Sequence, residues 1–234
     1  MPAKQFQVAA VGTVHVYKRK GARSLRISIA SDGKVRVTIP SWASYEEGLR
    51  FAHQKAGWIQ TNLPPQAQIL QSGQHVGKAH RLVFSVLPGD GVRTRIAGSE
   101  IRIIRPPSMV ASHPDVQKAA ESASIRAMRL EAQKLLPVRL RQLALAHGFT
   151  YNSVQVKQLK GRWGSCDSKK HIVLNLFLMQ LPWHLIDYVL LHELVHTEQL
   201  NHGDKFWERF LECEPRAKLY RAQIRKQKPV LKAV

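Results

Sequence analysis

Three histidines and one glutamate near the end of the chain have the types and spacing of a metal site. His192, Glu193 and His196 form the pattern His-Glu-x-x-His, and His202 follows six residues later. Histidines four residues apart lie on one face of an α-helix, so both rings can reach one Zn²⁺ ion at about 2.0 to 2.1 Å. A glutamate beside such an ion can take a proton from water whose pKa the metal lowers. The pattern predicts zinc-assisted hydrolysis with Glu193 as general base.

Two ligands are too few for a stable zinc site, and His202 is our candidate for the third. It lies too far along the chain to share the helical face of His196, so we expect a turn with Asn201 in the left-handed conformation. Three protein ligands leave one position open, as in catalytic rather than structural zinc sites. The metzincin pattern has Gly where this chain has Gln199, so the sequence does not indicate that group.

The elements around the histidines must hold them in place. We expect the helix that carries His192 to begin near Pro182, with Ile186 and Leu190 on its core face. A second, short helix that opens at Gly203 contributes three aromatic residues, which we expect to pack over the site. We therefore expect the histidines to lie between a buried helix and a layer of aromatic side chains.

The segments before this helix alternate between helical and strand patterns. Helical periodicity runs from about Pro114 to Ala146, and Pro137 within it allows one helix or two. Val154 and Val156 indicate a strand, and the apolar alternation from Ile172 to Leu176 predicts its antiparallel neighbour. Residues 160–167 between them are expected to form a loop.

Residues 1–107 are predicted to form a β-rich N-terminal subdomain with one helix. Apolar alternation on either side of Asp32-Gly33 predicts a hairpin, and Ser44 with Glu47 forms a capping box before the helix. Three more strands are predicted between Leu82 and Ile103. The stiff segment 106–108 is taken as the boundary, so that residues 108–234 form the domain with the histidines. The fold class expected is α+β.

The composition is that of a soluble globular protein. Hydrophobic residues make up 44% of the 234 residues, and no apolar run approaches the roughly 18 residues of a membrane span. Two cysteines do not make a disulfide framework, and the N-terminus has no pattern of a signal peptide. We therefore expect a cytoplasmic protein without membrane contact.

The formal net charge of +20 is the other global feature. Charge of this size raises the local concentration of anionic partners, which include nucleic acid, nucleotides and acidic proteins. It does not choose among them, and a merely solvated basic surface is the alternative. The sequence does not indicate an oligomeric state.

Several motifs follow one another over residues 155–212, namely Arg162–Cys166, Leu174-Asn175, Ile186–Val189, His192–His196, Asn201-His202 and Phe206-Trp207. Together they resemble the YgjP-like family of predicted zinc metallopeptidases, which is related to the SprT-like and WLM metallopeptidases. The resemblance implies that the three histidines bind zinc, that Glu193 is the catalytic base, and that the fold is a minimal zincin core whose edge strand can bind an extended substrate. Gly203 and Asp167 stand where Ser is expected.

Three other motif residues, Arg162, Tyr188 and Cys166, are assigned individually. Arg162 could stabilise an oxyanion or bind an anionic substrate, but we favour a structural pairing with Asp187. Tyr188 is interpreted as a core residue. Cys166 is interpreted as buried structure, because a fourth zinc ligand would close the site and prevent hydrolysis.

A zinc metallopeptidase is therefore the function that the sequence favours. Two alternatives stay open: a zinc-dependent hydrolase of nucleoside triphosphates, and a nucleic-acid-associated protease localised by its basic surface. The first would release phosphate from nucleotides, and the second would bind nucleic acid with a steep dependence on salt.

Overall fold

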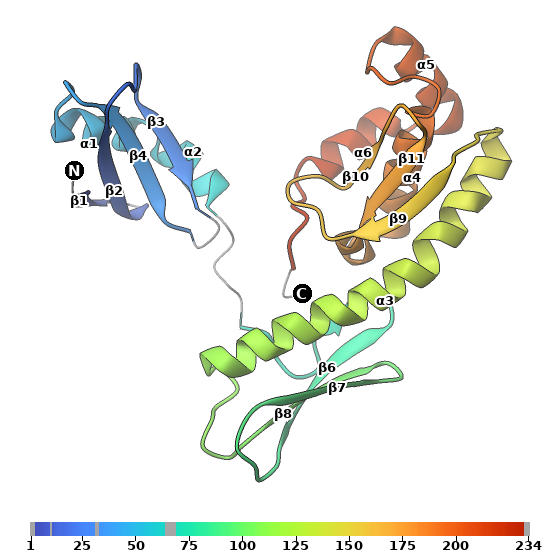
Figure 1. Cartoon of the computed structure of the whole chain (residues 1–234), viewed down its shortest axis with the longest axis horizontal. Coiled ribbons are helices and arrows are strands. Elements are labelled where there is room, and N and C mark those ends of the chain that lie inside the picture. Colours follow the sequence, from blue (N-terminus) through green and yellow to red (C-terminus); the bar gives the residue numbers. More distant parts are fainter. Residues whose placement is uncertain (1–2, 10, 31–32, 64–68, 232–234) are drawn as a thin grey trace. The chain divides into compact units, whose positions relative to one another are not determined.

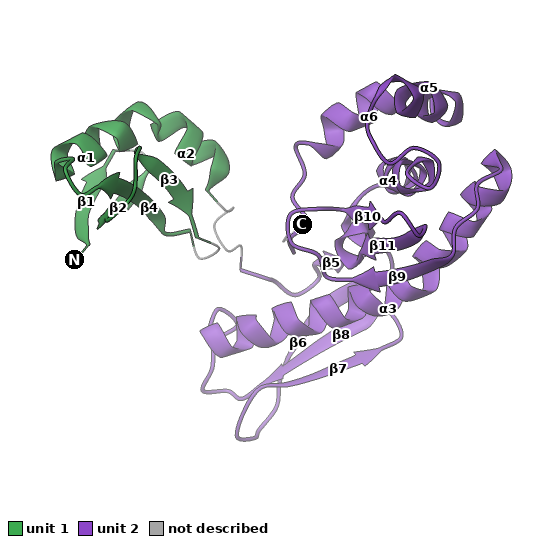
Figure 2. Cartoon of the chain, turned by 45° about the horizontal axis from the view of Figure 1, so that its top comes forward, with its two compact units in different colours: residues 1–68 green, residues 69–234 purple. Residues whose placement is uncertain are grey.

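A computed structural model of the 234-residue chain describes every residue except 1–2, 10, 31–32, 64–68 and 232–234. The fold is α+β, as expected, with three small sheets and six α-helices in the described residues (Figure 1). It divides into two compact units, residues 1–68 and 69–234 (Figure 2). The division thus lies at residues 68 and 69, whereas the sequence analysis placed a boundary at 107 and 108.

Unit 1 is a four-stranded sheet with helices on one face. Its elements are β1 (Lys4–Val8), β2 (Gly12–Arg19), β3 (Arg26–Ile29), β4 (Val35–Pro40), α1 (Tyr45–Gln54) and α2 (Ala56–Asn62). The strand order is β1-β2-β4-β3, and β2 and β4 run parallel. Valines of β2 and β4 pack with Ala52 and Ile59 of the helices to form a separate core.

Two local predictions for unit 1 are confirmed, while two of its strands were missed. β3 and β4 pair antiparallel around the expected turn, of which residues 31–32 lie outside the described residues. Ser44 accepts a hydrogen bond from the Glu47 amide at 3.1 Å, and Glu47 accepts one from the Ser44 amide at 2.7 Å, which completes the capping box. The sequence analysis did not predict β1 and β2.

Unit 2 begins with a second sheet that packs on a long helix. The elements are β5 (His75–Val76), β6 (His80–Val86), β7 (Arg93–Ala97), β8 (Glu100–Arg105) and α3 (Pro114–His147). The order is β5-β6-β8-β7, and α3 is one helix that continues through Pro137. Leu82 of β6 and Ile101 of β8 are buried in the same core as α3, which explains why this sheet belongs to unit 2.

The third sheet lies beside the helix that carries the histidines. Its strands are β9 (Ser153–Lys157), β10 (Gly164–Cys166) and β11 (His171–Asn175), in the order β10-β11-β9. The prediction that β9 and β11 are antiparallel is wrong, since they pair parallel. The segment expected as a loop contains β10, which pairs antiparallel with β11 on its other side. The chain therefore crosses the sheet between β9 and β10, and this leaves β10 at the edge.

Four short elements complete unit 2. They are the 3₁₀ helix η1 (Leu176–Gln180), α4 (Trp183–Val195), α5 (Asp204–Cys213) and α6 (Ala217–Ile224). Ile186, Leu190 and Leu194 of α4 are fully buried, as predicted. Arg139 of α3 binds Asp187 of α4 through two hydrogen bonds of 2.8 and 2.7 Å, which ties the two helices together. No helix among the described residues has the length and apolar character needed to cross a membrane.

Candidate metal centre and active site

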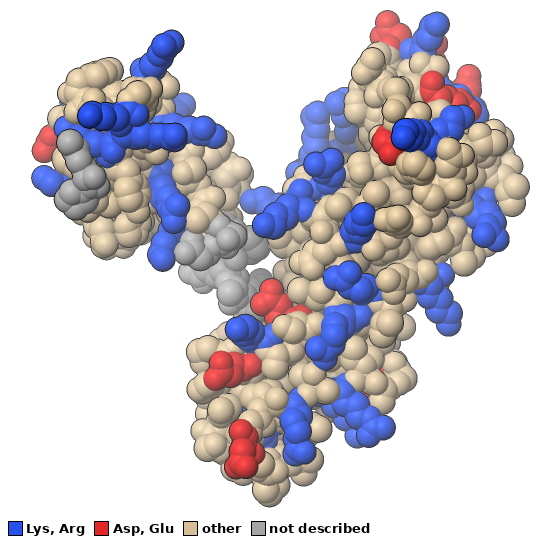
Figure 3. All heavy atoms as spheres, viewed as in Figure 1, with Lys and Arg blue, Asp and Glu red and all other residues tan. Residues whose placement is uncertain are grey.

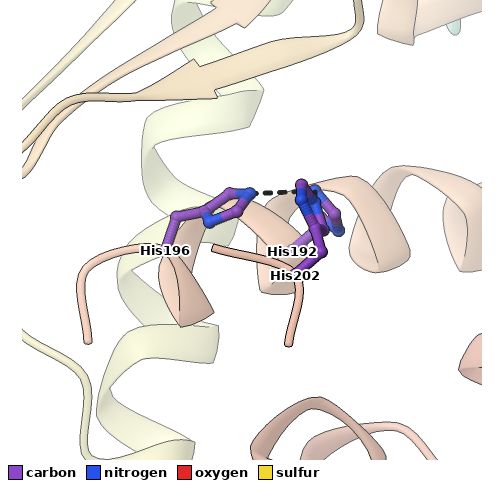
Figure 4. A group of neighbouring side chains, drawn as sticks. All are labelled: His192, His196 and His202. Carbon is purple, nitrogen blue, oxygen red and sulfur yellow. Dashed lines mark hydrogen bonds between the residues drawn. The ribbon is translucent and has the colours of Figure 1, made fainter. Parts of the chain in front are cut away.

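The three histidines of the sequence pattern converge on one point (Figure 4). His192 lies in the last turn of α4, His196 caps the end of this helix, and His202 lies just before α5. The Nε2 atom of His192 is 3.2 Å from that of His196 and 3.0 Å from that of His202. One ligand atom from each ring lies within 4.8 Å of the others. Among the described residues, this is the one such group of His, Cys, Asp or Glu side chains.

The spacing of these nitrogens fits a tetrahedral metal ion. Ligands at 2.0 to 2.1 Å in tetrahedral geometry lie about 3.3 Å from one another, close to the separations between the Nε2 atoms. A single proton can bridge only one pair of these nitrogens, whereas a cation can accept a lone pair from each. The donor set therefore fits a zinc ion with three protein ligands.

The surroundings of the rings favour the neutral imidazole that binds metals. Nδ1 of His196 lies 3.0 Å from the carbonyl oxygen of Gln199, and a proton donated there leaves Nε2 as the acceptor. Burial, with smaller contributions from the other two histidines and Arg221, lowers the pKa of His192 to about 3. Burial is also the largest cause that lowers the pKa of His196. Protons therefore compete weakly for these nitrogens.

The turn between His196 and His202 differs from our prediction. Lys170 is the one non-glycine residue with a positive φ in the described part of the chain, so the prediction of a left-handed Asn201 is wrong. The helix ends instead through capping bonds, because the Thr197 hydroxyl donates to the Leu194 carbonyl at 2.7 Å. A side chain that caps the last turn removes the need for a left-handed residue there.

Phe206 of α5 supplies the expected aromatic packing against the histidines. Its ring centroid lies 5.0 Å from that of His192, 4.8 Å from that of His196 and 4.7 Å from that of His202. Phe206 is fully buried. One rigid side chain thus contacts all three rings, which limits their rotation before a metal binds.

Glu193 follows His192 in the chain and is buried, and one of its carboxylate oxygens lacks a hydrogen-bond partner within the described part of the chain. It is 5% exposed, and its Oε2 atom has no partner among the described residues. Burial raises the pKa of Glu193 to about 8, while the charge of Arg162 acts in the opposite direction. A cation at the histidines would also favour the carboxylate form. Such an unpartnered buried carboxylate beside a cluster of metal-binding groups is typical of a catalytic base.

Gly164 of β10 packs directly against this carboxylate. A Cβ atom at position 164 would lie 2.6 Å from Oε1 of Glu193, closer than real contacts of this kind. The backbone of the edge strand therefore forms one wall of the site. The sequence analysis named Gly164 only as part of a motif, because its contact with Glu193 joins segments 29 residues apart.

The predicted pairing of Arg162 with Asp187 is wrong. Asp187 binds Arg139 instead, and the exposed Arg162 guanidinium has no hydrogen-bond or ion-pair partner among the described residues. The loop is held by its backbone, because the buried Asn175 amide donates to the carbonyls of Leu159 at 2.9 Å and Arg162 at 2.8 Å. This support leaves the Arg162 side chain unpaired within the described residues, and its charge acts to lower the pKa of Glu193.

Tyr188 and Cys166 take the places expected for structural residues. Tyr188 is 5% exposed, and its ring lies 5.1 Å from that of Phe210. Cys166 is half-buried and is not part of the group of metal-binding atoms. Burial, followed by the charge of Glu193, raises the pKa of Cys166 to about 11. Its thiol is therefore protonated near neutral pH, which does not favour metal binding.

Comparison with known proteins connects this site to metallopeptidases. The sequence model of a family described as YgjP-like, metallopeptidase domain, matches residues 23–227. Crystal structures of two metallopeptidase zymogens are similar to part of the chain, namely abylysin of Pyrococcus abyssi and jannalysin of Methanocaldococcus jannaschii. The identities are 25% and 19%, the TM-scores 0.36 and 0.35, and the matches cover 38% and 39% of this chain and 91% and 94% of those chains. No curated protein matches the sequence.

Proposed function

Because the chain belongs to the YgjP-like family of metallopeptidase domains, we propose that it is a zinc-dependent peptidase in which His192, His196 and His202 hold the metal and Glu193 is the general base. The observation that carries this proposal is the convergence of the three Nε2 atoms, together with the buried carboxylate of Glu193, which follows His192 in the chain and has an unpartnered oxygen among the described residues. Imidazole nitrogens suit zinc, and three protein ligands are typical of a catalytic site.

The chemistry divides between the metal and the side chains of this chain. A bound zinc ion would polarise the scissile carbonyl and lower the pKa of water at the site. Glu193 accepts a proton from the attacking water and can return it to the leaving amine. Its burial helps, because a carboxylate that water does not solvate is a stronger base.

We assign stabilisation of the developing oxyanion to Arg162. Its charge favours the ionised form of Glu193, and it lacks an ion-pair partner within the described residues. The two hydrogen bonds from Asn175 fix the loop from which it projects. A preorganised cation next to the reacting carbonyl stabilises the transition state more than the substrate.

The edge strand β10 suggests how the substrate lies. It is the outer strand of the sheet β10-β11-β9, and Gly164 within it contacts Glu193. An extended peptide can add to an edge strand through backbone hydrogen bonds. We infer that the substrate is an extended, unfolded segment of protein placed alongside β10, with its scissile bond at the histidines.

The test is cleavage of an unstructured protein by zinc-loaded wild type beside Glu193→Gln, with the zinc content of both measured. We expect cleavage by the wild type and a loss of about 10²- to 10⁴-fold in the variant, with zinc retained. Equal cleavage by the variant would contradict the assignment of Glu193. Phosphate release from nucleoside triphosphates, abolished by the same change, would instead support the nucleotide hydrolase.

A further inference from the structure

The sheet of unit 1 has one face that neither of the unit's described helices, α1 and α2, covers. α1 packs on β1, β2 and β4 from one side, and Figures 1 and 2 show α1 and α2 on the same side of the sheet. The covered face carries the valines of the core. The residues that alternate with them lie on the open face.

The strand register places aromatic and basic residues side by side on this open face. Tyr17 of β2 pairs with Thr38 of β4, which pairs with Arg26 of β3. In the neighbouring row, His15 of β2 pairs with Arg36 of β4. Residues that are direct partners across strands share a face, so these five side chains form one continuous surface. We call this set the open-face cluster.

The two aromatic rings of the cluster form a stacking platform. The rings of His15 and Tyr17 are 6.4 Å apart between centroids and are inclined by only 23°. Both are partly exposed, whereas Val14 and Val16 on the other face of the same strand are buried. Aromatic side chains on a sheet surface are the groups on which unpaired nucleic-acid bases stack.

Basic residues without partners lie next to this platform. A hollow of about 530 Å³ is lined by four basic residues, Arg19, Lys20, Arg23 and Arg26, and by the small or hydroxyl-bearing residues Gly21, Ala22, Ser24, Ser28 and Thr38. No acidic residue lines it, and none of its four cations has an ion-pair partner among the described residues. Figure 3 looks onto the strands of unit 1 and shows Lys and Arg side chains across them.

Unit 1 also has a higher ratio of basic to acidic residues than the rest of the chain. Residues 1–68 contain ten Lys and Arg against three Asp and Glu, whereas residues 69–234 contain 26 against 13. Glu46 and Glu47 lie on α1, away from the open face. A phosphate group on this face therefore meets several cations and no described carboxylate.

We propose that the open face of unit 1 binds single-stranded nucleic acid, with bases stacked on His15 and Tyr17 and phosphates held by the arginines and Lys20. A duplex hides its bases from such a platform, so single strands are the better fit. Lipid headgroups would use the cations but not the flat aromatic pair. This binding site is made by residues of unit 1 and the metal centre by residues of unit 2, and the binding does not depend on the peptidase activity.

The test is fluorescence anisotropy of the full chain with labelled 12-nucleotide single strands of RNA and of DNA, over a range of salt concentrations. We expect Arg26→Ala with Arg36→Ala to weaken binding by about tenfold or more and to reduce the salt slope by about 1.4, because each phosphate contact of a single strand contributes about 0.7. Tyr17→Leu should weaken binding by about fivefold or more without changing this slope, because it removes stacking and no charge. Arg50→Ala, an exposed arginine on α1, is the matched control and should bind as the wild type does.

Several outcomes would overturn the proposal. They are the absence of binding, equal affinity for a duplex of the same length, tighter binding to anionic vesicles, and loss of binding with Arg225→Ala of the C-terminal region but not with Arg26→Ala and Arg36→Ala. Circular dichroism of each variant verifies that unit 1 is folded. Glu193→Gln should bind like the wild type, which keeps failure of this proposal distinct from failure of the peptidase assignment.

Discussion

Two buried glutamates in unit 2 have similar exposure and opposite surroundings. Glu131 of α3 is 7% exposed and Glu193 of α4 is 5% exposed. Glu131 accepts hydrogen bonds from the amides of Lys78 at 2.7 Å and Ala79 at 2.9 Å, and it lies 2.5 Å from Nδ1 of His80. Both of its oxygens are thus occupied, and they hold the turn between β5 and β6 against α3.

Glu193 has no comparable set of partners. Its Oε2 atom is unpartnered among the described residues, and the backbone of Gly164 closes over Oε1. A buried carboxylate with all its hydrogen bonds made stabilises the fold, whereas one left without them destabilises it. The difference teaches that burial alone does not identify a catalytic acid or base. What distinguishes Glu193 is that it follows the candidate ligand His192 in the chain and keeps an oxygen without a partner among the described residues.

Among changes that leave both glutamates in place, replacing Arg162 by Ala should cause the largest loss of kcat. Loss of an oxyanion-stabilising group lowers kcat by about 10²- to 10³-fold, and KM should change little. Steady-state peptide hydrolysis measures both constants. Lys160→Ala, a nearby exposed charge, is the control and should retain the wild-type kcat. A rise in KM alone would show that Arg162 only binds the substrate.

Replacing Gly164 by Ala should disturb Glu193 and leave Glu131 untouched. The new Cβ would lie 2.6 Å from Oε1, so the carboxylate must move. Because a shift of about 1 Å can reduce the rate of catalysis by about 10²-fold, we expect kcat to fall by about ten- to hundredfold while the zinc content stays constant. Gly91→Ala, where a Cβ meets no atom within 4 Å, is the control. An unchanged kcat would argue that the position of Glu193 is not critical.

Replacing Glu131 by Gln should weaken the fold and spare the chemistry. The amide cannot accept from all three donors, so the free energy of unfolding of unit 2 should fall by about 1 to 3 kcal/mol. Urea unfolding monitors this loss. Glu121→Gln changes an exposed residue of the same helix and should have little effect on stability. Equal stability of the two variants would contradict the structural role given to Glu131.

Replacing Cys166 should have the smallest effect on peptide hydrolysis, although the thiol interacts electrostatically with Glu193. With its pKa raised to about 11, the thiol is protonated at pH 7.5, and alkylation by iodoacetamide should become fast only as the pH approaches that value. The measurement is made in a Cys213→Ser background, so that one thiol reacts. Cys166→Ser should retain zinc and peptide hydrolysis. Loss of zinc in that variant would reveal a fourth ligand.

The features that could be predicted from the sequence are those whose pattern lies within one short segment of the chain. His192 and His196 share one helical turn, and the apolar periodicity of α4 follows from the same segment. The capping box at Ser44 is likewise contained in four residues. Such features depend on backbone geometry that any helix has.

The remaining features depend on contacts between distant segments. Arg139 and Asp187 are 48 residues apart, and Glu131 meets Ala79 over 52 residues, so neither pairing has a pattern in the sequence. The parallel pairing of β9 with β11 depends on a crossover rather than on alternation. The prolines at 106–107 end a strand but do not separate two cores, because β6 and β8 pack on α3.

The most direct test of the account compares peptide hydrolysis per folded molecule in Glu193→Gln and Glu131→Gln, each loaded with zinc. The same chemical change is made at two buried glutamates, so any difference between the variants comes from their surroundings. The account predicts that Glu193→Gln stays folded and loses about 10²- to 10⁴-fold in turnover, while Glu131→Gln keeps wild-type turnover in its folded fraction. Turnover lost equally in both variants, or retained in Glu193→Gln, would contradict it.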